Sequence, residues 1–416
     1  MTARLAIESI AAGGDGVGRS EGMAVFVPRT APGDVADVAL DVRGRFARGA
    51  VVRLVEPAAE RVTPPCVHYE RDRCGGCQLQ HLAYNAQRSA KSGIVRDAMQ
   101  RIGKRDITAV TVRPSPAEWG YRTKLTLALR WQGDRWVAGL HQYDDPDAVF
   151  DLEVCPITDD RVLAIWRDVM AMSSAFPRVK RLRGAVRLTP VGASFVLEGG
   201  THWGTASRFA EGVAALTTVW WEPAGGRRRL LVDRRAGSAS LGVEGEVKSP
   251  DAAFTQVNPR AAAELHEHVV SLAMTYSPAY VVDGYAGAGA TAIALAHRGV
   301  RVAAIELDAD AARWTGAHLP AGCRSIVGRV EDALPRAMPA DVVLLNPPRG
   351  GVDEQVTAAL ETAPPTAIIY VSCNPATLAR DVRRLPTFRI SSLLSFDLFP
   401  QTAHVETVCE LVREAA

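Results

Sequence analysis

The spacing of hydrophobic and polar positions changes along the chain and divides it into three parts. Residues 1–56 show short apolar runs separated by glycine turns, a pattern typical of a small all-β unit; the runs lie at 5–8, 23–28, 35–40 and 49–55. Short strands and turns dominate again from about residue 121 to residue 243. Beyond residue 251, strand-length apolar runs alternate with helical segments, and this favours a parallel sheet covered on both faces.

These patterns predict an α/β protein with three domains. We expect a small OB-type β-barrel over 1–56, a β-rich central domain over 57–245 and a Rossmann-like domain over 246–416. A helical segment around 82–112 is expected to pack on the last domain. Within that domain the pattern predicts strands at 280–283, 300–306, 341–345 and 367–371, and helices at 259–273, 290–298 and 309–316.

Composition and charge narrow the class of protein. The chain has 416 residues, 47% of them hydrophobic and 23% charged, which is typical of a globular protein with more than one core. No apolar run approaches the roughly 20 residues of a membrane helix, and the first residues lack the features of a signal peptide. We therefore expect a cytoplasmic protein. We also expect it to act as a monomer.

The net charge is only +2, but basic side chains are clustered, as phosphate binding requires. The same clusters could also be ordinary solvated surface. They comprise Arg43, Arg45, Arg48 and Arg53 in the barrel, and, in the central region, Arg178, Lys180, Arg181, Arg183, Arg187, Arg227, Arg228, Arg229, Arg234 and Arg235.

A glycine-rich turn at residues 283–290 predicts a cofactor site. It follows an apolar strand that ends at Asp283 and precedes a helix, and glycines there let the backbone approach a ligand. Glu306 ends the next strand, where its carboxylate can bind both hydroxyls of a ribose. Spacing alone does not separate S-adenosylmethionine from NAD. The missing third glycine of the dinucleotide pattern and the acid at the first strand end favour the cationic S-adenosylmethionine.

Two further strand ends carry candidate chemistry. Cys373 lies directly after a buried strand, and the Asn-Pro that follows ends the strand and exposes the thiol at the edge of the sheet. A thiolate can add to C6 of uracil and turn C5 into a nucleophile, after which a base must remove the C5 proton. Glu406, in Thr-Ala-His-Val-Glu-Thr, is the candidate base. Asn346, in Asn-Pro-Pro-Arg, ends another strand and can bind the base or the cofactor.

Four of the seven cysteines predict a metal site. Three lie close together in sequence and the fourth follows later: Cys66, Cys74, Cys77 and Cys155. In a cytoplasmic protein, crowded cysteines favour metal binding or catalysis over disulfides. Four thiolates suit either zinc or an iron–sulfur cluster, and spacing does not choose between them.

Together these motifs resemble the bacterial RNA uracil-C5 methyltransferases. The resemblance covers the whole chain and is most specific from residue 254 to Glu406. It implies that Cys373 is the nucleophile and Glu406 the base. It also implies a [4Fe-4S] cluster rather than zinc at the four cysteines, and a TRAM-like RNA-binding domain at residues 1–56. The resemblance also implies that Gln256, Tyr285, Glu306 and Asn346 contact the cofactor. The glycine-rich turn predicts two further contacts, Asp283 and Gly287.

The sequence departs from the family pattern at three places. Asn346 stands where many members have aspartate, Tyr285 stands where phenylalanine is usual, and Cys66 and Cys74 are further apart than in some relatives, so we expect the intervening loop to bulge. Asparagine can still bond a uracil edge, so we expect activity to be retained.

The resemblance implies that the chain methylates C5 of a uridine in structured RNA. Large-subunit (23S) ribosomal RNA is the expected substrate, because the cysteine site, the TRAM-like domain and Asn-Pro-Pro-Arg occur together in ribosomal-RNA relatives. A transfer-RNA enzyme is the alternative within the family. Outside it, the alternatives are a non-catalytic RNA-binding protein and an NAD-dependent iron–sulfur oxidoreductase.

Overall fold

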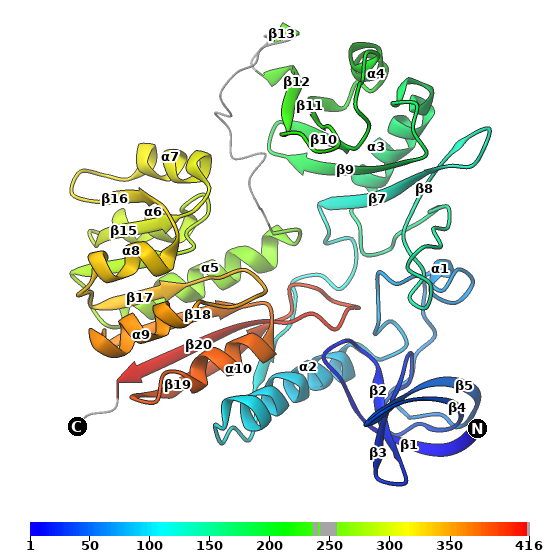
Figure 1. The fold of residues 1–416 in the computed structure, drawn as a ribbon, viewed down its shortest axis with the longest axis horizontal. Coiled ribbons are helices and arrows are strands. Elements are labelled where there is room, and N and C mark those ends of the chain that lie inside the picture. Colours follow the sequence, from blue (N-terminus) through cyan, green and yellow to red (C-terminus); the bar gives the residue numbers. More distant parts are fainter. Residues whose placement is uncertain (236–239, 242–255, 414–416) are drawn as a thin grey trace.

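The computed structural model describes residues 1–235, 240–241 and 256–413, which fold around three β-sheets (Figure 1). The expected boundary between 245 and 246 and the motif residues Phe254 and Thr255 lie outside the described residues. Among the described helices, none has both the length and the apolar character needed to cross a membrane.

The first 56 residues form a closed barrel, as the pattern predicted. The strands follow the order β1-β2-β3-β5-β4. Inward-facing side chains such as Leu5, Ile7 and Val25 alternate with outward-facing ones and fill the interior, because successive side chains of a strand point to opposite faces. The strands are β1 (Thr2–Ile10), β2 (Gly16–Ser20), β3 (Met23–Val27), β4 (Val35–Arg43) and β5 (Phe46–Glu56).

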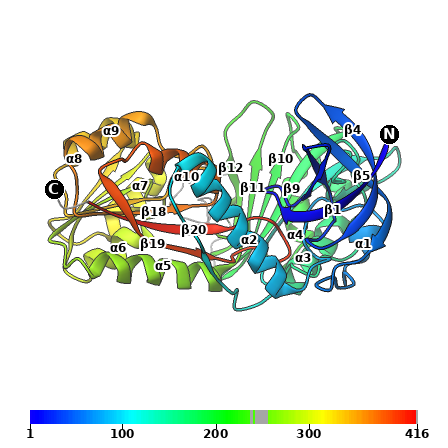
Figure 2. The same cartoon turned by 90° about the horizontal axis from the view of Figure 1, so that it is seen from below.

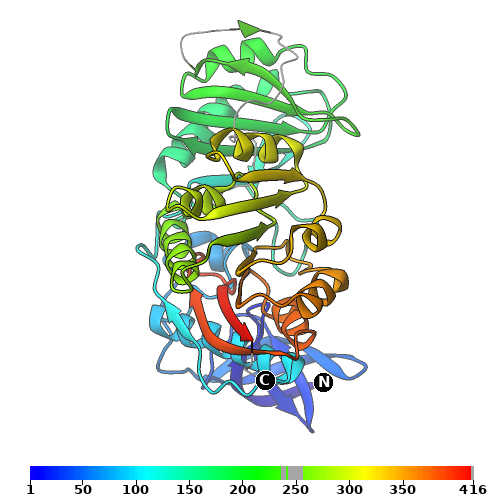
Figure 3. The same ribbon diagram turned by 90° about the vertical axis from the view of Figure 1, so that its left-hand side faces the viewer.

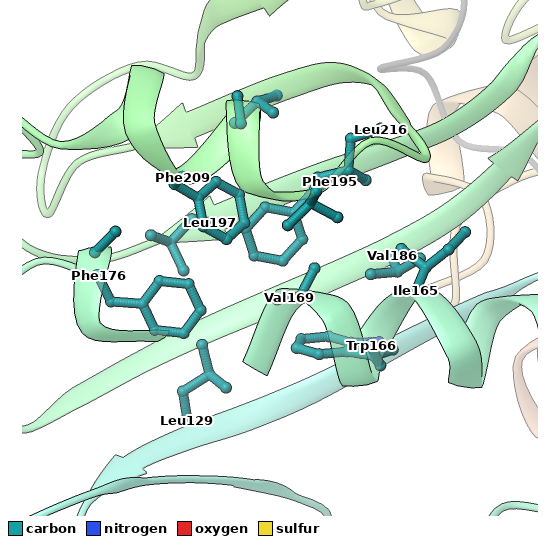
Figure 4. Packing of buried hydrophobic residues seen from close by; sticks show 14 of the residues in the cluster. Leu129, Ile165, Trp166, Val169, Phe176, Val186, Phe195, Leu197, Phe209 and Leu216 are labelled. Carbon is teal, nitrogen blue, oxygen red and sulfur yellow. The ribbon is translucent and has the colours of Figure 1, made fainter. Parts of the chain in front are cut away.

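The central region is built on a seven-stranded sheet of order β13-β12-β11-β10-β9-β7-β8. Its apolar face packs against α3 (Asp160–Ala171) and α4 (Ala206–Gly212), with Trp166, Phe195 and Phe209 in the core (Figure 4). The sequence pattern missed both helices. The strands are β7 (Lys124–Trp131), β8 (Trp136–Gly139), β9 (Arg181–Thr189), β10 (Gly192–Glu198), β11 (Leu216–Glu222), β12 (Arg229–Asp233) and β13 (Ser240–Leu241), and η2 (Ser173–Ala175) is a short 3₁₀ turn.

The third sheet has eight strands in the order β16-β15-β14-β17-β18-β20-β19-β6 (Figure 3). Its first five are parallel, whereas β20 is antiparallel to both of its neighbours. The predicted strands are confirmed to within about two residues. The strands are β6 (Thr111–Arg113), β14 (Tyr280–Gly284), β15 (Arg301–Glu306), β16 (Arg324–Val327), β17 (Val342–Leu345), β18 (Ala367–Ser372), β19 (Phe388–Phe396) and β20 (Glu406–Arg413).

Helices cover both faces of this sheet, as its near-continuous apolar strands require. Val281 and Val282, adjacent on β14, belong to two different cores on opposite faces. One core includes α5 (Pro259–Met274) and α6 (Ala290–Ala296); the other includes α8 (Val330–Ala337), α9 (Glu354–Thr362) and α10 (Pro375–Arg383). Helix α7 (Ala309–His318) packs beside β15 and β16.

A segment from the first half of the chain also packs on this sheet. Helix α2 (Tyr84–Ala98) continues as the π-helical turn η1 (Met99–Gly103) and lies against α10 (Figures 1 and 2). Met99 is fully buried in the core of the sheet, and β6 pairs in parallel with β19 as the edge strand. The segment that carries the first three cysteines leads into α2. Within that segment only α1 (Val67–Glu70) is helical.

Candidate active site

Three parallel strands end side by side at one edge of the eight-stranded sheet. In register, Gly284 of β14 lies opposite Leu345 of β17, which lies opposite Tyr370 of β18. The glycine-rich turn, Asn346 and Cys373 follow these strand ends. The order of the strands reverses between β14 and β17, and a crevice at such a point is where open α/β sheets bind ligands.

The glycine-rich turn is tied to the end of the neighbouring strand. The backbone N–H of Gly287 donates to Oε2 of Glu306 at 2.8 Å, and Oε1 of the same carboxylate accepts from the N–H of Asp308 at 2.8 Å. Gly289 begins α6 with a φ of +76°, and a Cβ there would lie 2.5 Å from the side chain of Thr315. Only glycine therefore fits at this position.

The two acidic side chains at this turn favour a positively charged ligand. The pKa of Asp283 is raised to about 7, chiefly by burial and also by the nearby carboxylate of Glu306, while a hydrogen bond from the N–H of Ala292 opposes the rise. The Oδ2 atom of Asp283 is buried and has no hydrogen-bond partner among the described residues. A cation would relieve both the repulsion and the unmet bond, whereas a pyrophosphate would add negative charge. The residues present therefore fit S-adenosylmethionine.

The other predicted cofactor contacts lie around this turn. Tyr285 takes a left-handed backbone conformation, with a φ of +62°, directly after β14. Asn346 is exposed at the end of β17, and its backbone N–H donates to the carbonyl of Gly284 at 3.2 Å. Gln256 is half-buried just before α5, and the carbonyl of the next residue, Val257, accepts a bond from Thr123.

Antiparallel pairing brings Cys373 and Glu406 to neighbouring positions. Ser372 of β18 lies opposite Thr407 of β20, so the next pair outward consists of Cys373 and Glu406. Glu406 also lies opposite Phe396 of β19. Two candidate residues that are far apart in sequence therefore meet at the edge that carries the cofactor turn.

Burial shifts the pKa of both groups upward. Glu406 is 4% exposed, and burial raises its pKa to about 8. Burial also raises the pKa of the half-buried Cys373 thiol, and the charge of Glu406 adds to that rise. A carboxyl group whose pKa lies near neutrality can exchange protons, as a general base must.

Arg349 supplies the opposing positive charge. Its charge opposes the rise in the pKa of Cys373 and of Glu406, and it adds to the effect of burial in lowering the pKa of His404. Its carbonyl accepts bonds from Asn374 Nδ2 at 3.1 Å and from Thr377 Oγ1 at 3.3 Å. The sequence motif Asn-Pro-Pro-Arg predicted a role only for its asparagine. Because arginine is always charged, its position beside a strand end was the signal that could have identified Arg349 as a functional residue.

The four predicted metal-binding cysteines are all buried, and Cys66, Cys77 and Cys155 belong to one hydrophobic cluster. Each is at most 8% exposed and none is in a disulfide. Burial raises the pKa of Cys74 to about 11 and raises that of Cys77, and the charges of the other cysteines add to both shifts. Within the described part of the chain, no group of three or more His, Cys, Asp or Glu is arranged to hold a metal ion. Four of the seven residues between Cys66 and Cys74 form α1.

The basic runs of the central region are partly neutralised. Arg183 pairs with Glu198 at 2.9 Å, and Arg228 pairs with Glu222 at 2.9 Å. Lys124, opposite Arg187 in the sheet, is half-buried, and burial together with neighbouring arginines lowers its pKa to about 8. The strands of this sheet therefore carry interleaved charges of both signs rather than a uniform basic face.

Comparisons with known proteins agree with this geometry. A family model described as tRNA (uracil-5-)-methyltransferase matches residues 324–414. The chain is 31% identical to an uncharacterised RNA methyltransferase of Thermosynechococcus vestitus, over 99% of this chain and 98% of the relative. It is 30% identical to another from Protochlamydia amoebophila, over 97% and 96%.

A solved structure shares the whole fold. The tRNA (uracil-54, C5)-methyltransferase of Pyrococcus abyssi, determined in complex with S-adenosyl-L-homocysteine, superposes with a TM-score of 0.70 and covers 98% of this chain and 99% of that one. The two sequences are 22% identical. The combination of an N-terminal barrel, a central sheet and an α/β sheet is thus a known arrangement.

Proposed function

Because the chain belongs to the RNA uracil-C5 methyltransferase family, we propose that it methylates C5 of a uridine through a covalent bond between Cys373 and C6 of the base. The neighbouring positions of Cys373 and Glu406 on β18 and β20 carry this proposal. The nucleophile and the base must both reach the same uracil ring from one side of the sheet. The register of β18 and β20 supports this, because it gives the two residues neighbouring positions.

The chemistry begins at the sulfur of Cys373. Its thiolate adds to C6, the 5,6 double bond opens, and the electron pair becomes available at C5 as an enolate. S-adenosylmethionine, when bound, supplies the electrophilic methyl group that C5 accepts. Glu406 then takes the remaining proton from C5, the double bond re-forms, and the S–C6 bond breaks to release the thiolate.

Arg349 opposes the upward pKa shifts of both groups. Its charge favours the carboxylate of Glu406 against burial, and it favours the thiolate of Cys373 against burial and the charge of Glu406. A base enclosed in a duplex stack would not reach these groups, so the target uridine must be flipped out or lie in a single-stranded loop.

We propose cofactor-binding residues at the same edge of the sheet. Glu306 would accept the ribose hydroxyls, and Asp283, Tyr285 and Gly287 would line the turn around the methionyl and adenosyl parts. Gln256 and Asn346 would face the cofactor or the base. The Asp283 oxygen without a partner and the proximity of two carboxylates support a cationic ligand.

The four cysteines would hold a [4Fe-4S] cluster, and the barrel would grip RNA as a TRAM-like domain does. Four buried thiols outside disulfides are the ligand type that such a cluster takes, and this supports the proposal. Methyl transfer changes no oxidation state, so the site's role would be structural. Iron and acid-labile sulfide in protein purified without oxygen test this assignment. One equivalent of zinc in place of about four of iron would refute it.

Large-subunit ribosomal RNA is the proposed substrate, supported by Asn346-Pro-Pro-Arg together with the barrel and the four cysteines. Transfer RNA is the second candidate, because the Pyrococcus abyssi enzyme of the same fold acts on tRNA. Comparing 5-methyluridine in both RNAs from a wild-type and a deletion strain separates them. We expect loss from ribosomal RNA alone; loss from tRNA alone would exclude the ribosomal assignment.

The mechanism is tested with two variants and total RNA from the deletion strain. Cys373→Ala should abolish methyl incorporation while cofactor binding persists. Glu406→Gln should accumulate an RNA–protein adduct that survives denaturation, because the adduct forms but cannot eliminate. Turnover by the first variant would refute the nucleophile, and free RNA alone with the second would refute the base.

A further inference from the structure

The connection that leads into the base Glu406 is buried and held by side chains from elsewhere in the chain. Between the end of β19 at Phe396 and Glu406, most residues are buried and only His404 is exposed. Lys91 of α2 anchors the start of this connection through Asp397 at 2.5 Å, and both side chains are fully buried. Tyr121 donates to the carbonyl of Pro400 at 3.0 Å.

A pair of glutamines fixes the middle of the connection. Gln87 Nε2 donates to Gln401 Oε1 at 2.8 Å, and the backbone N–H of Gln401 donates to Gln87 Oε1 at 2.9 Å. Gln401 has a φ of +71°, a conformation that costs energy for any residue other than glycine. Gln87 uses its second N–H on the carbonyl of Leu82, so its amide is fully engaged.

The segment that carries Cys74 and Cys77 holds the other side of the same connection. The N–H groups of Gln78 and Leu79 both donate to the carbonyl of Gln401, at 3.1 and 3.0 Å. Gln78 Oε1 accepts from the N–H of Ala403 at 3.3 Å, three residues before Glu406. The connection therefore lies between α2 on one side and the cysteine segment on the other.

We propose that Gln87 is a positioning residue for the base: together with Gln78 it holds Gln401 and so sets where the Glu406 carboxylate stands relative to the target ring. Strand pairing of β20 begins at Glu406, which is the first residue of that strand and lies opposite Phe396. The residues just before it are held by contacts that include those of Gln87 and Gln78. The inference rests on the proposed function, because it takes Glu406 as the group that removes the C5 proton.

The first test replaces Gln87 by leucine, which keeps the size and the helix but removes both bonds to Gln401. A shift of the base by a fraction of an ångström slows the proton-removal step and not the addition of Cys373. We expect turnover to fall by about tenfold to a hundredfold. We also expect a denaturation-resistant RNA adduct to appear with total RNA from the deletion strain, as with Glu406→Gln.

Two further variants separate positioning from loss of structure. Gln401→Gly suits the left-handed backbone and keeps the backbone bonds, but it removes the side-chain acceptor for Gln87; it should fold and also accumulate adduct. Gln100→Leu makes the same chemical change at an exposed position of η1, where the side chain bonds only Ile107, and should behave as wild type.

A double variant makes the test decisive. If Gln87 acts through Glu406 alone, adding Gln87→Leu to Glu406→Gln should leave the amount and lifetime of the adduct unchanged within about twofold. The inference would be overturned if the double variant lost more adduct than Glu406→Gln alone. It would also be overturned if the Gln87→Leu and Gln401→Gly proteins were folded but accumulated no adduct. Either outcome would leave Glu406 as the base. Absence of adduct with Glu406→Gln alone would instead overturn the proposed function.

Discussion

The two halves of the eight-stranded sheet build their parts of the site in different ways. In the parallel half, the cofactor turn, Glu306 and Asp308 are joined by short-range bonds between neighbouring strands. In the antiparallel half, Cys373 and Glu406 meet only because β20 inserts between β18 and β19. The cofactor turn and Glu306 lie within one βαβ unit, β14-α6-β15, whereas the meeting of Cys373 and Glu406 depends on long-range register.

This difference predicts different consequences of mutation. A change in the parallel half should alter cofactor affinity and leave the reacting groups in place. A change at the reacting groups beside the antiparallel half should alter the chemical steps at unchanged cofactor affinity, because the charge of Arg349 acts on Cys373 and Glu406 and that of Glu406 acts on Cys373. Each prediction below tests whether the two halves are separable in this way.

The largest expected effect is that of Arg349→Ala, because this side chain follows β17 of the parallel half but its charge acts on Cys373 and Glu406. Loss of this charge disfavours both the thiolate of Cys373 and the carboxylate of Glu406, so we expect kcat/KM for RNA to fall about a hundredfold, a size typical of lost electrostatic stabilisation in an active site. Cofactor Kd, measured by calorimetry, should change less than twofold. Arg336→Ala, at an exposed position of α8, is the matched control. A normal kcat/KM for Arg349→Ala would show that the charge is not used.

A smaller effect is expected from Glu306→Gln in the parallel half. The amide keeps an acceptor but loses the charge that Gly287 and Asp308 share, and it becomes a poorer partner for a ribose. We expect cofactor Kd to rise about tenfold, or about 1.4 kcal/mol. At saturating cofactor, kcat should stay within about twofold.

Asp332→Asn removes a comparable charge from an exposed position of α8 and serves as the control for that measurement. A lower kcat with unchanged Kd for Glu306→Gln would contradict the separation of the two halves. It would mean that Glu306 acts in the chemistry rather than in binding.

The parallel half was predictable from sequence because its signals are local. Apolar runs, the glycine turn and the acid at the end of β15 lie within one stretch of chain, and the observed strands match. Cys373 was predicted at a strand end for the same reason. The pairing that brings Glu406 beside it has no local signal, because register is set by the packing of β18, β19 and β20 together.

Other features escaped for related reasons. Helix α3 was predicted as part of a β-rich region, although Asp159 caps its first turn and Val162, Trp166 and Val169 form one buried stripe. Gln87 and Gln401 gave no signal at all, because an amide pair becomes meaningful only when two distant segments meet. The runs of basic residues predicted a positively charged face. They did not show that some of these arginines pair with acidic side chains on adjacent strands.

A smaller effect still concerns pH in the antiparallel half. Glu406 and Cys373 must both lose a proton to act, and burial raises the pKa of each, so kcat/KM for RNA should increase as pH rises. With a pKa of about 8, the carboxylate fraction of Glu406 grows about fivefold between pH 7 and pH 8. A profile that is flat or falls over this range would contradict the assignment of Glu406 as the base.

Alkylation of Cys373 isolates the coupling between the two groups. Since the charge of Glu406 raises the pKa of this thiol, Glu406→Gln should lower that pKa and speed reaction with iodoacetamide at pH 8 by about twofold to threefold. Mass spectrometry can follow each peptide, and the partly exposed Cys323 in the parallel half serves as an internal control whose rate should not change. Equal acceleration at both cysteines would mean that the variant loosens the whole sheet, and the charge coupling inferred at its antiparallel half would then be wrong.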